Sequence, residues 1–182
     1  MTVGAGILDT CCLINLFASG KGSDILQATQ HKWYVPAVVM GESLFLRGED
    51  SQGQATREPL DLASIVSSGV IEIAEARNEA ENDLFVTLAQ SLDDGEAMAL
   101  AIAGFRSWVL ATDDRRARNC ASRLDVQVIT TPEMISLWYE RAGASKEAVA
   151  ELIARIERLA RFFPAKDAPL AEWWGKLRRM AL

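Results

Sequence analysis

The sequence has little of several features that mark specialised protein classes. Its 182 residues include 12 glycines and 5 prolines, too few for a collagen-like or low-complexity chain. The longest nearly uncharged apolar run, residues 97–104, is far shorter than the roughly 20 residues that a membrane-spanning helix needs. The first residues contain no basic segment of the kind that opens a secretory signal. We therefore expect a folded cytoplasmic protein without a membrane segment.

Cysteine and histidine are also scarce, which limits the kinds of metal and catalytic site. The three cysteines, Cys11, Cys12 and Cys120, form no CxxC pair, so neither a disulfide framework nor a zinc knuckle fits. The single histidine, His31, excludes a multi-histidine metal site and weakens the case for histidine-based nucleophilic catalysis. Any metal site in this chain must therefore be built from oxygen ligands.

Charge is distributed unevenly along the chain. The formal net charge is −6, yet residues 1–104 contain 5 basic and 15 acidic side chains, whereas residues 146–182 contain 8 basic and 5 acidic ones. An acidic balance argues against strong non-specific binding to nucleic acid, but it leaves room for local basic surfaces. One candidate surface, which also fits a merely solvated helix face, is a run of four arginines: Arg115, Arg116, Arg118 and Arg123.

The hydrophobic pattern predicts strands that alternate with helices. Strand signals cover residues 5–8, 33–35, 70–73, 108–111 and 126–129, of which the first and fourth read as fully buried. Helical patterns cover residues 10–18, 36–46, 55–67, 76–92, 94–105 and 115–124. This alternation predicts an α/β fold, a three-layer α/β/α sandwich around a central parallel sheet.

The end of the chain reads as helix throughout, over residues 132–142, 146–162 and 170–180. We therefore expect a domain of residues 1–132 and an all-helical C-terminal extension, residues 133–182, packed on it. The extension is a candidate subunit interface, so a homodimer is one expectation. Trp173 and Trp174 stand beside a basic cluster and suit stacking on nucleic acid, although docking on the protein's own core is the more frequent role of such a pair.

Carboxylates occur next to apolar sequence at several separate places. Asp9 and Asp113 each come directly after a predicted buried strand, and parallel strands present their carboxyl ends at one edge of the sheet, where ligands bind. Glu42 lies in the helix predicted over residues 36–46, and Glu96 shares a helix face with apolar residues. Each acid alone also fits a helix cap, a first-turn acid or an exposed position. Together they indicate one shared site.

A shared site of this kind needs a compensating charge. An isolated buried carboxylate costs several kcal/mol or takes up a proton, so converging acids require a cation. Mg²⁺ and Mn²⁺ prefer oxygen ligands and suit three or four carboxylates without histidine. The sequence therefore predicts a Mg²⁺ or Mn²⁺ site.

The order of these motifs resembles that of PIN domains. The segments that carry the resemblance are Ile7-Leu8-Asp9-Thr10, Val38-Val39-Met40-Gly41-Glu42, Asp94-Gly95-Glu96-Ala97 and Thr112-Asp113-Asp114-Arg115-Arg116-Ala117-Arg118. The likeness is to the prokaryotic branch with a GEA motif and a DDRxAR segment, related to VapC-type toxins, and it covers roughly residues 5–132.

This resemblance implies a Mg²⁺- or Mn²⁺-dependent endoribonuclease that hydrolyses single-stranded RNA, often as the toxin of a pair with a small antitoxin protein. The positions that match the family acids, and that are expected to bind the metal, are Asp9, Glu42, Glu96 and one of Asp113 and Asp114. Two flanking hydroxyl residues, expected to fix the rotamers of these acids, are Thr10 and Thr112. The arginines expected to contact substrate phosphate are Arg115, Arg116 and Arg118.

Two other functions remain open at this stage. One is a Mg²⁺-dependent phosphohydrolase with Asp9 as the covalent nucleophile. A haloacid-dehalogenase-type enzyme of this kind would have a second aspartate two residues later, where this chain has Cys11. The other is a non-catalytic PIN-like module that binds protein partners through its helical extension.

Overall fold

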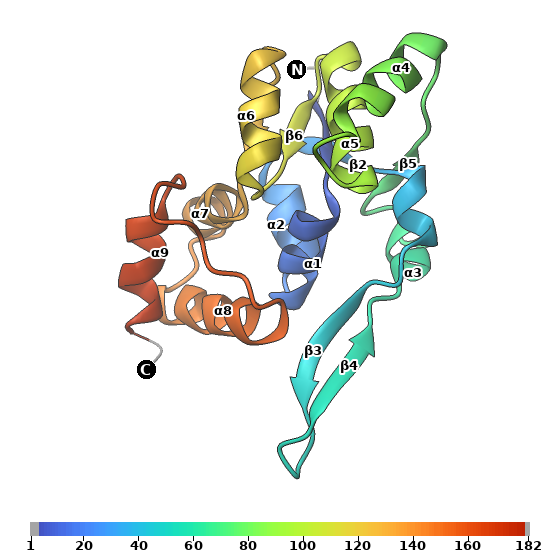
Figure 1. The fold of residues 1–182 in the computed structure, drawn as a ribbon. Coiled ribbons are helices and arrows are strands. Elements are labelled where there is room, and N and C mark those ends of the chain that lie inside the picture. The colour runs from blue at the N-terminus through green and yellow to red at the C-terminus, as the bar shows by residue number, and fades with distance from the viewer. Residues whose placement is uncertain (1–3, 181–182) are drawn as a thin grey trace. The chain divides into compact units, whose positions relative to one another are not determined.

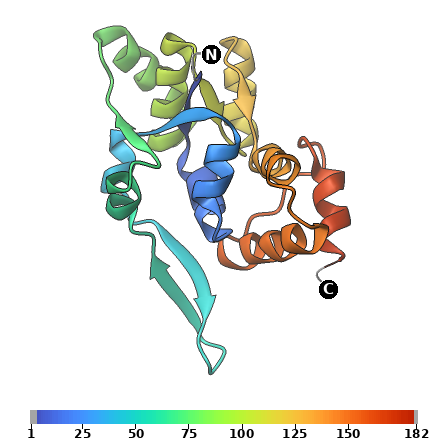
Figure 2. The same ribbon diagram turned by 180° about the vertical axis from the view of Figure 1, so that it is seen from behind.

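The computed structural model describes residues 4–180, which Figure 1 and Figure 2 show from opposite sides. The chain forms two compact units. The first unit contains the described residues up to Leu13 together with Gln30–Glu42 and Leu62–Thr130. The second contains Ile14–Thr29, Ser43–Asp61 and the described residues from Thr131 onward. The division of the chain at residue 132 into a domain and an extension stays a prediction.

A parallel five-stranded sheet organises the first unit, in the order β5-β2-β1-β6-β7. Its strands are β1 (Gly4–Leu8), β2 (His31–Pro36), β5 (Glu72–Ala74), β6 (Val109–Ala111) and β7 (Val128–Ile129). Ile7 and Leu8 point to opposite faces of the central strand and neither is exposed to solvent. Both faces of the sheet are therefore covered, which confirms the predicted three-layer α/β/α fold.

Helices of the first unit pack on one face of the sheet around α5 (Asp94–Arg106), which contacts β1, β2 and β6. Its alanines and Leu100 are fully buried, because small side chains let the helix approach the strands closely. The neighbours α4 (Glu79–Leu88) and α6 (Arg115–Arg123) pack against α5. The remaining helical segments of this unit are α3 (Leu62–Ser67), the 3₁₀ helix η1 (Ala37–Gly41) and the first turn of α1 (Thr10–Ala18).

The second unit is made of helices and one hairpin. Its elements, besides the rest of α1, are α2 (Gly22–Ala28), β3 (Phe45–Glu49), β4 (Ala55–Pro59), α7 (Thr131–Ala142), α8 (Lys146–Leu159) and α9 (Ala171–Arg178). Helix α2 packs on α7, and α8 packs on both α9 and β3. The buried stripe of α8, Val149, Leu152, Ile153 and Ile156, is the apolar stripe expected of an amphipathic helix.

Two predicted helices are wrong. Residues 36–46 instead end β2 at Pro36, form η1 and begin β3 at Phe45, because the β-branched pair Val38-Val39 and the following Gly41 disfavour a longer α-helix. Residues 55–67 form β4, which ends at Pro59, and only then α3.

Other predicted boundaries also shift. The strand predicted at 70–73 starts at Glu72, and the one predicted at 126–129 is only Val128–Ile129. The predicted helix 76–92 shortens to Glu79–Leu88. The α2 helix and the β3–β4 hairpin were not expected from the sequence.

Within residues 4–180 the structure contains no helix long and apolar enough to cross a bilayer.

A buried ion pair joins α4 to the end of α5. Arg106 donates from Nε to Glu81 Oε1 and from Nη2 to Oε2, each at 2.9 Å, with side-chain exposures of 8% and 2%. The backbone N–H of Arg77 donates to the same carboxylate at 2.6 Å, and the Arg106 guanidinium lies over the Trp108 ring. Arg106 first, and the Arg77 amide after it, hold the pKa of Glu81 below its usual range.

We expect Glu81→Gln to lower the free energy of unfolding by about 3 kcal/mol at pH 7, because it leaves the Arg106 charge buried without its partner. The ionised Glu81 stabilises the fold fully above its unfolded-state pKa of about 4.3, and that stabilisation is lost as the pH falls through the lowered folded-state pKa. The difference between wild type and variant should therefore shrink below pH 4 in urea titrations. Exposed Glu79→Gln on the same helix is the control; an equal loss there would contradict the role of the pair.

Candidate functional site

Acidic residues follow the carboxyl ends of three adjacent strands, β2, β1 and β6, at one edge of the sheet. Asp9 follows β1 directly, and its backbone N–H donates to Ala111 O on β6 at 3.0 Å. Thr112 and Asp113 follow β6, and Glu42 follows β2 through η1. This is the edge at which open parallel sheets bind ligands.

Asp9 is almost completely buried, with 1% of its surface exposed. Its Oδ1 accepts a hydrogen bond of 2.6 Å from the Cys12 amide and so caps the N-terminus of α1. Its Oδ2 has no hydrogen-bond partner of normal geometry among the described residues. Burial raises the pKa of Asp9 to about 8, the neighbouring charges of Asp113 and Glu96 raise it further, and the Thr112 hydroxyl and Cys12 amide oppose them. The charged form of such an acid requires a compensating cation.

Cys12 links Asp9 to Asp113. Its backbone N–H binds the first carboxylate, and its thiol donates to Asp113 Oδ2 at 3.2 Å. Asp113 is half-buried, and its carbonyl oxygen accepts a hydrogen bond of 2.5 Å from Arg118 Nη1. The guanidinium of Arg118 thus holds the segment that carries Asp113.

Glu96 lies in the first turn of α5 and is 8% exposed. The N-cap of that helix is Asp93, whose Oδ1 accepts from the Glu96 amide at 2.9 Å. Burial raises the pKa of Glu96 to about 7, the charges of Asp93 and Asp114 raise it as well, and Arg116 lowers it. Glu96 is therefore a second acid whose negative charge is poorly compensated.

Glu42 is an exposed residue at the end of η1, not part of a helix as predicted. Its Oε2 accepts a hydrogen bond of 3.2 Å from the Thr10 hydroxyl, and burial and the charges of Asp93 and Asp94 raise its pKa. Gly95 lies directly beside this pair. A Cβ atom built on Gly95 would come within 2.7 Å of Thr10 Oγ1 and 3.1 Å of Glu42 Oε1.

Asp114 is the N-cap residue of α6. Its Oδ1 accepts from the amides of Arg116 and Ala117 at 2.7 and 2.9 Å, and its own amide donates to Thr112 Oγ1. Arg115 and Arg116 are exposed in the first turn of this helix. Of the two consecutive acids, Asp113 is the one whose charge acts on Asp9, and Asp114 the one whose charge acts on Glu96.

The structure thus brings Asp9, Glu96, Asp113 and Asp114 into electrostatic contact, with Glu42 held at the side by Thr10. Sequence reasoning gave no role to Cys12, although its position three residues after a helix-capping aspartate was a usable signal.

Whether these residues fit a metal ion depends on their chemistry. In the described part of the chain no three acid, cysteine or histidine side chains stand at the spacing of a formed metal site. The donor set nevertheless suits a hard divalent cation, because it is made of carboxylates and includes the unpartnered, buried Oδ2 of Asp9.

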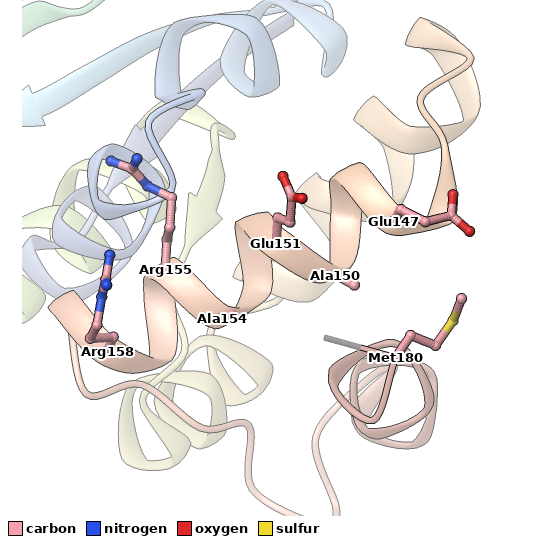
Figure 3. Close-up of a pocket in the computed structure, with 7 residues that line it drawn as sticks. All are labelled: Glu147, Ala150, Glu151, Ala154, Arg155, Arg158 and Met180. Carbon is pink, nitrogen blue, oxygen red and sulfur yellow. The ribbon is translucent and has the colours of Figure 1, made fainter. Parts of the chain in front are cut away.

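A large surface hollow in the second unit is unrelated to these acids. It measures about 620 Å³ and follows α8, between Glu147 at one end and Arg158 at the other, with Met180 at its side (Figure 3). None of the acids predicted from the sequence lines it. The candidate site is therefore the acidic edge of the sheet, not this hollow.

We expect Gly95→Ala to destabilise the first unit by about 1–3 kcal/mol, because the new methyl group pushes apart Thr10 and Glu42. Gly104→Ala on the same helix is the matched control. Its Cβ would meet only Val126 and Leu84 at 3.6 and 3.9 Å, so it should stabilise the helix by up to about 1 kcal/mol. Chemical denaturation measures both; equal effects of the two variants would show that Gly95 is not sterically required.

Comparison with known proteins agrees with this geometry. The sequence profile of a family described as PIN domain matches residues 5–167, which is most of the chain. A search of curated proteins found no significant match. The parallel sheet with acids at the ends of its adjacent strands, together with this match, shows that the chain belongs to the PIN-domain family, a nuclease fold.

Proposed function

We propose that this protein is a Mg²⁺- or Mn²⁺-dependent endoribonuclease that hydrolyses single-stranded RNA. The observation that carries the proposal is Asp9, a buried carboxylate with an unpartnered oxygen beside the further acids Glu96 and Asp113. Such a group costs several kcal/mol unless a proton or a cation compensates its charge. Membership of a nuclease family makes a catalytic cation the coherent explanation.

The residues that would hold the cation are Asp9 through Oδ2, Glu96 and Asp113. When bound, a divalent ion supplies positive charge that stabilises the phosphorane-like transition state and lowers the pKa of water. Glu42, held by the Thr10 hydroxyl, would complete the set of metal ligands or orient water. Asp114 keeps α6 in place as its cap and so fixes the segment on which Asp113 lies.

Substrate phosphate would meet the exposed guanidinium groups of Arg115 and Arg116. Both lie in the first turn of α6, where the helix dipole also favours an anion. Arg118 is a positioning residue, because its guanidinium is engaged by the Asp113 carbonyl.

We also propose that the protein is the toxin of a toxin–antitoxin pair, with a small antitoxin protein as its partner. Expression in a bacterial host tests this role. Growth should stop when the wild type is induced, continue with Asp9→Asn, and recover when the adjacent small reading frame is co-expressed. Unimpaired growth with the wild type would contradict the toxin role but not the ribonuclease activity.

We expect Mn²⁺ to raise the melting temperature of the wild type at pH 7.5 and to leave that of Asp9→Asn unchanged. The asparagine keeps the Oδ1 acceptor for the Cys12 amide but removes the charge that binds the cation. A thermal shift titration of the full chain measures this, with exposed Asp83→Asn as the control that should respond like wild type. An equal rise of the melting temperature in Asp9→Asn and Asp83→Asn would show that the cation does not bind at Asp9.

We also expect Asp9→Asn and Glu96→Gln each to lower the rate of single-stranded RNA cleavage by roughly 100-fold or more, because bound metal supplies several kcal/mol of transition-state stabilisation. A fluorogenic RNA assay with Mn²⁺, and with EDTA as the metal-free arm, measures the rate. Cleavage that persists undiminished in both variants contradicts the assignment. Metal binding without cleavage of any RNA would favour the non-catalytic binding module.

A further inference from the structure

A basic hollow in the second unit is lined by none of the residues assigned to the candidate site. It measures about 690 Å³ and is lined by α9 and the segment before it. Four of its lining side chains are cationic, Lys166, Lys176, Arg178 and Arg179, against the single carboxylate of Glu172. The hollow is therefore positively charged, although the net charge of the whole chain is −6.

The hollow is built on one face of a docked helix. Trp174 and Leu177, on the opposite side of α9, are 2% and 5% exposed. Trp174 Nε1 donates to Glu157 Oε1 on α8 at 2.9 Å, and Phe162 packs edge-on against its ring. Trp174 thus docks on the protein's own core, and the half-buried Trp173 lies against the Tyr139 ring.

The outward face of α9 carries the charge. Gly175 and Lys176 lie three and four residues after Glu172, and Arg179 lies four and three residues after them, so all four share that face. Among the described residues no ion pair engages Lys176 or Arg179, whereas Arg178 is bound to Glu157 at 2.9 Å. The carboxylate of Glu157 is therefore neutralised and does not offset the two free cations.

Two further features suit an extended ligand. Gly175 leaves the floor of the hollow open, and a Cβ there would meet only Arg179 Nη1 at 3.8 Å, so packing does not require a glycine. Phe163 is 52% exposed, with the Arg178 guanidinium 5.2 Å from its ring centre. Cations along a groove beside an exposed aromatic ring are the elements of single-strand binding, in which phosphates are neutralised and bases stack.

We infer that this hollow, the α9 groove, binds the phosphodiester backbone of single-stranded RNA outside the cleavage site. The inference rests on the proposed ribonuclease function for the identity of the polyanion. The groove then adds affinity for longer RNA and takes no part in the chemical step.

The test measures binding of a fluorescein-labelled 20-nucleotide RNA by anisotropy, in EDTA and in the full-length Asp9→Asn background, so that cleavage cannot interfere. We expect Lys176→Gln with Arg179→Gln to weaken binding about 10-fold at 0.1 M salt. The slope of log affinity against log salt should fall by about 1.4, since each phosphate contact on a single strand contributes about 0.7. Lys146→Gln with Arg158→Gln, an equal charge change at exposed positions of α8, should change both quantities much less.

A second variant, Gly175→Met, fills the groove without altering charge. The melting temperature should not fall, because methionine is a better helix former than glycine and finds open space there. RNA binding should still weaken. Unchanged RNA binding in both groove variants, or equal loss in the α8 control, overturns the inference.

The remaining outcomes separate this inference from the proposed function. In the active chain, Lys176→Gln with Arg179→Gln should raise KM for a 20-nucleotide RNA more than for a 4-nucleotide one and leave kcat unchanged. Groove-dependent RNA binding by a chain that cleaves no RNA supports the groove and contradicts the ribonuclease. Polyglutamate that competes as well as RNA of equal charge overturns RNA as the ligand and indicates an acidic protein segment instead.

Discussion

The burial of one carboxylate, that of Asp9, is the constraint on which the site depends. The residue lies where the central strand β1 ends and α1 begins, so one of its carboxylate oxygens caps the helix. The other is left inside the protein without a partner among the described residues. Burial and the neighbouring acids both disfavour the charged form. A fold that retains this group needs a proton or a cation there, and acids from α5 and β6 surround the same position.

Three helices begin at this acidic edge, and each is capped by an aspartate: α1 by Asp9, α5 by Asp93 and α6 by Asp114. The partial positive charge at each N-terminus offsets part of the repulsion between the carboxylates. For Asp9, the capping role and the proposed metal-binding role are compatible, because the cap uses only Oδ1 and leaves Oδ2 for a cation.

The predicted position of Asp9 and Asp113 at the ends of buried strands is confirmed, whereas the helix predicted around Glu42 is wrong. Asp9 and Asp113 were predictable because a strand's carboxyl end is visible as the point where an apolar run meets a polar residue. The helix prediction for residues 36–46 rests on Pro36, which suits a first helical turn, and on the apolar residues around Glu42. Such an apolar run fits a strand or a 3₁₀ turn equally well. The hairpin strands β3 and β4 were not predicted either. Strand β4 is exposed along its whole length, so it has no alternation of apolar and polar residues by which a strand could be predicted.

The sequence by itself determined the parallel α/β architecture and the positions of the strand-end acids, since these follow from hydrophobic periodicity and residue order. Only the tertiary structure decided that the Cys12 thiol joins α1 to Asp113 and that Glu81 on α4 pairs with Arg106 on α5. These contacts join residues far apart in the sequence whose side-chain directions depend on packing between elements, and local propensity carries no information about them.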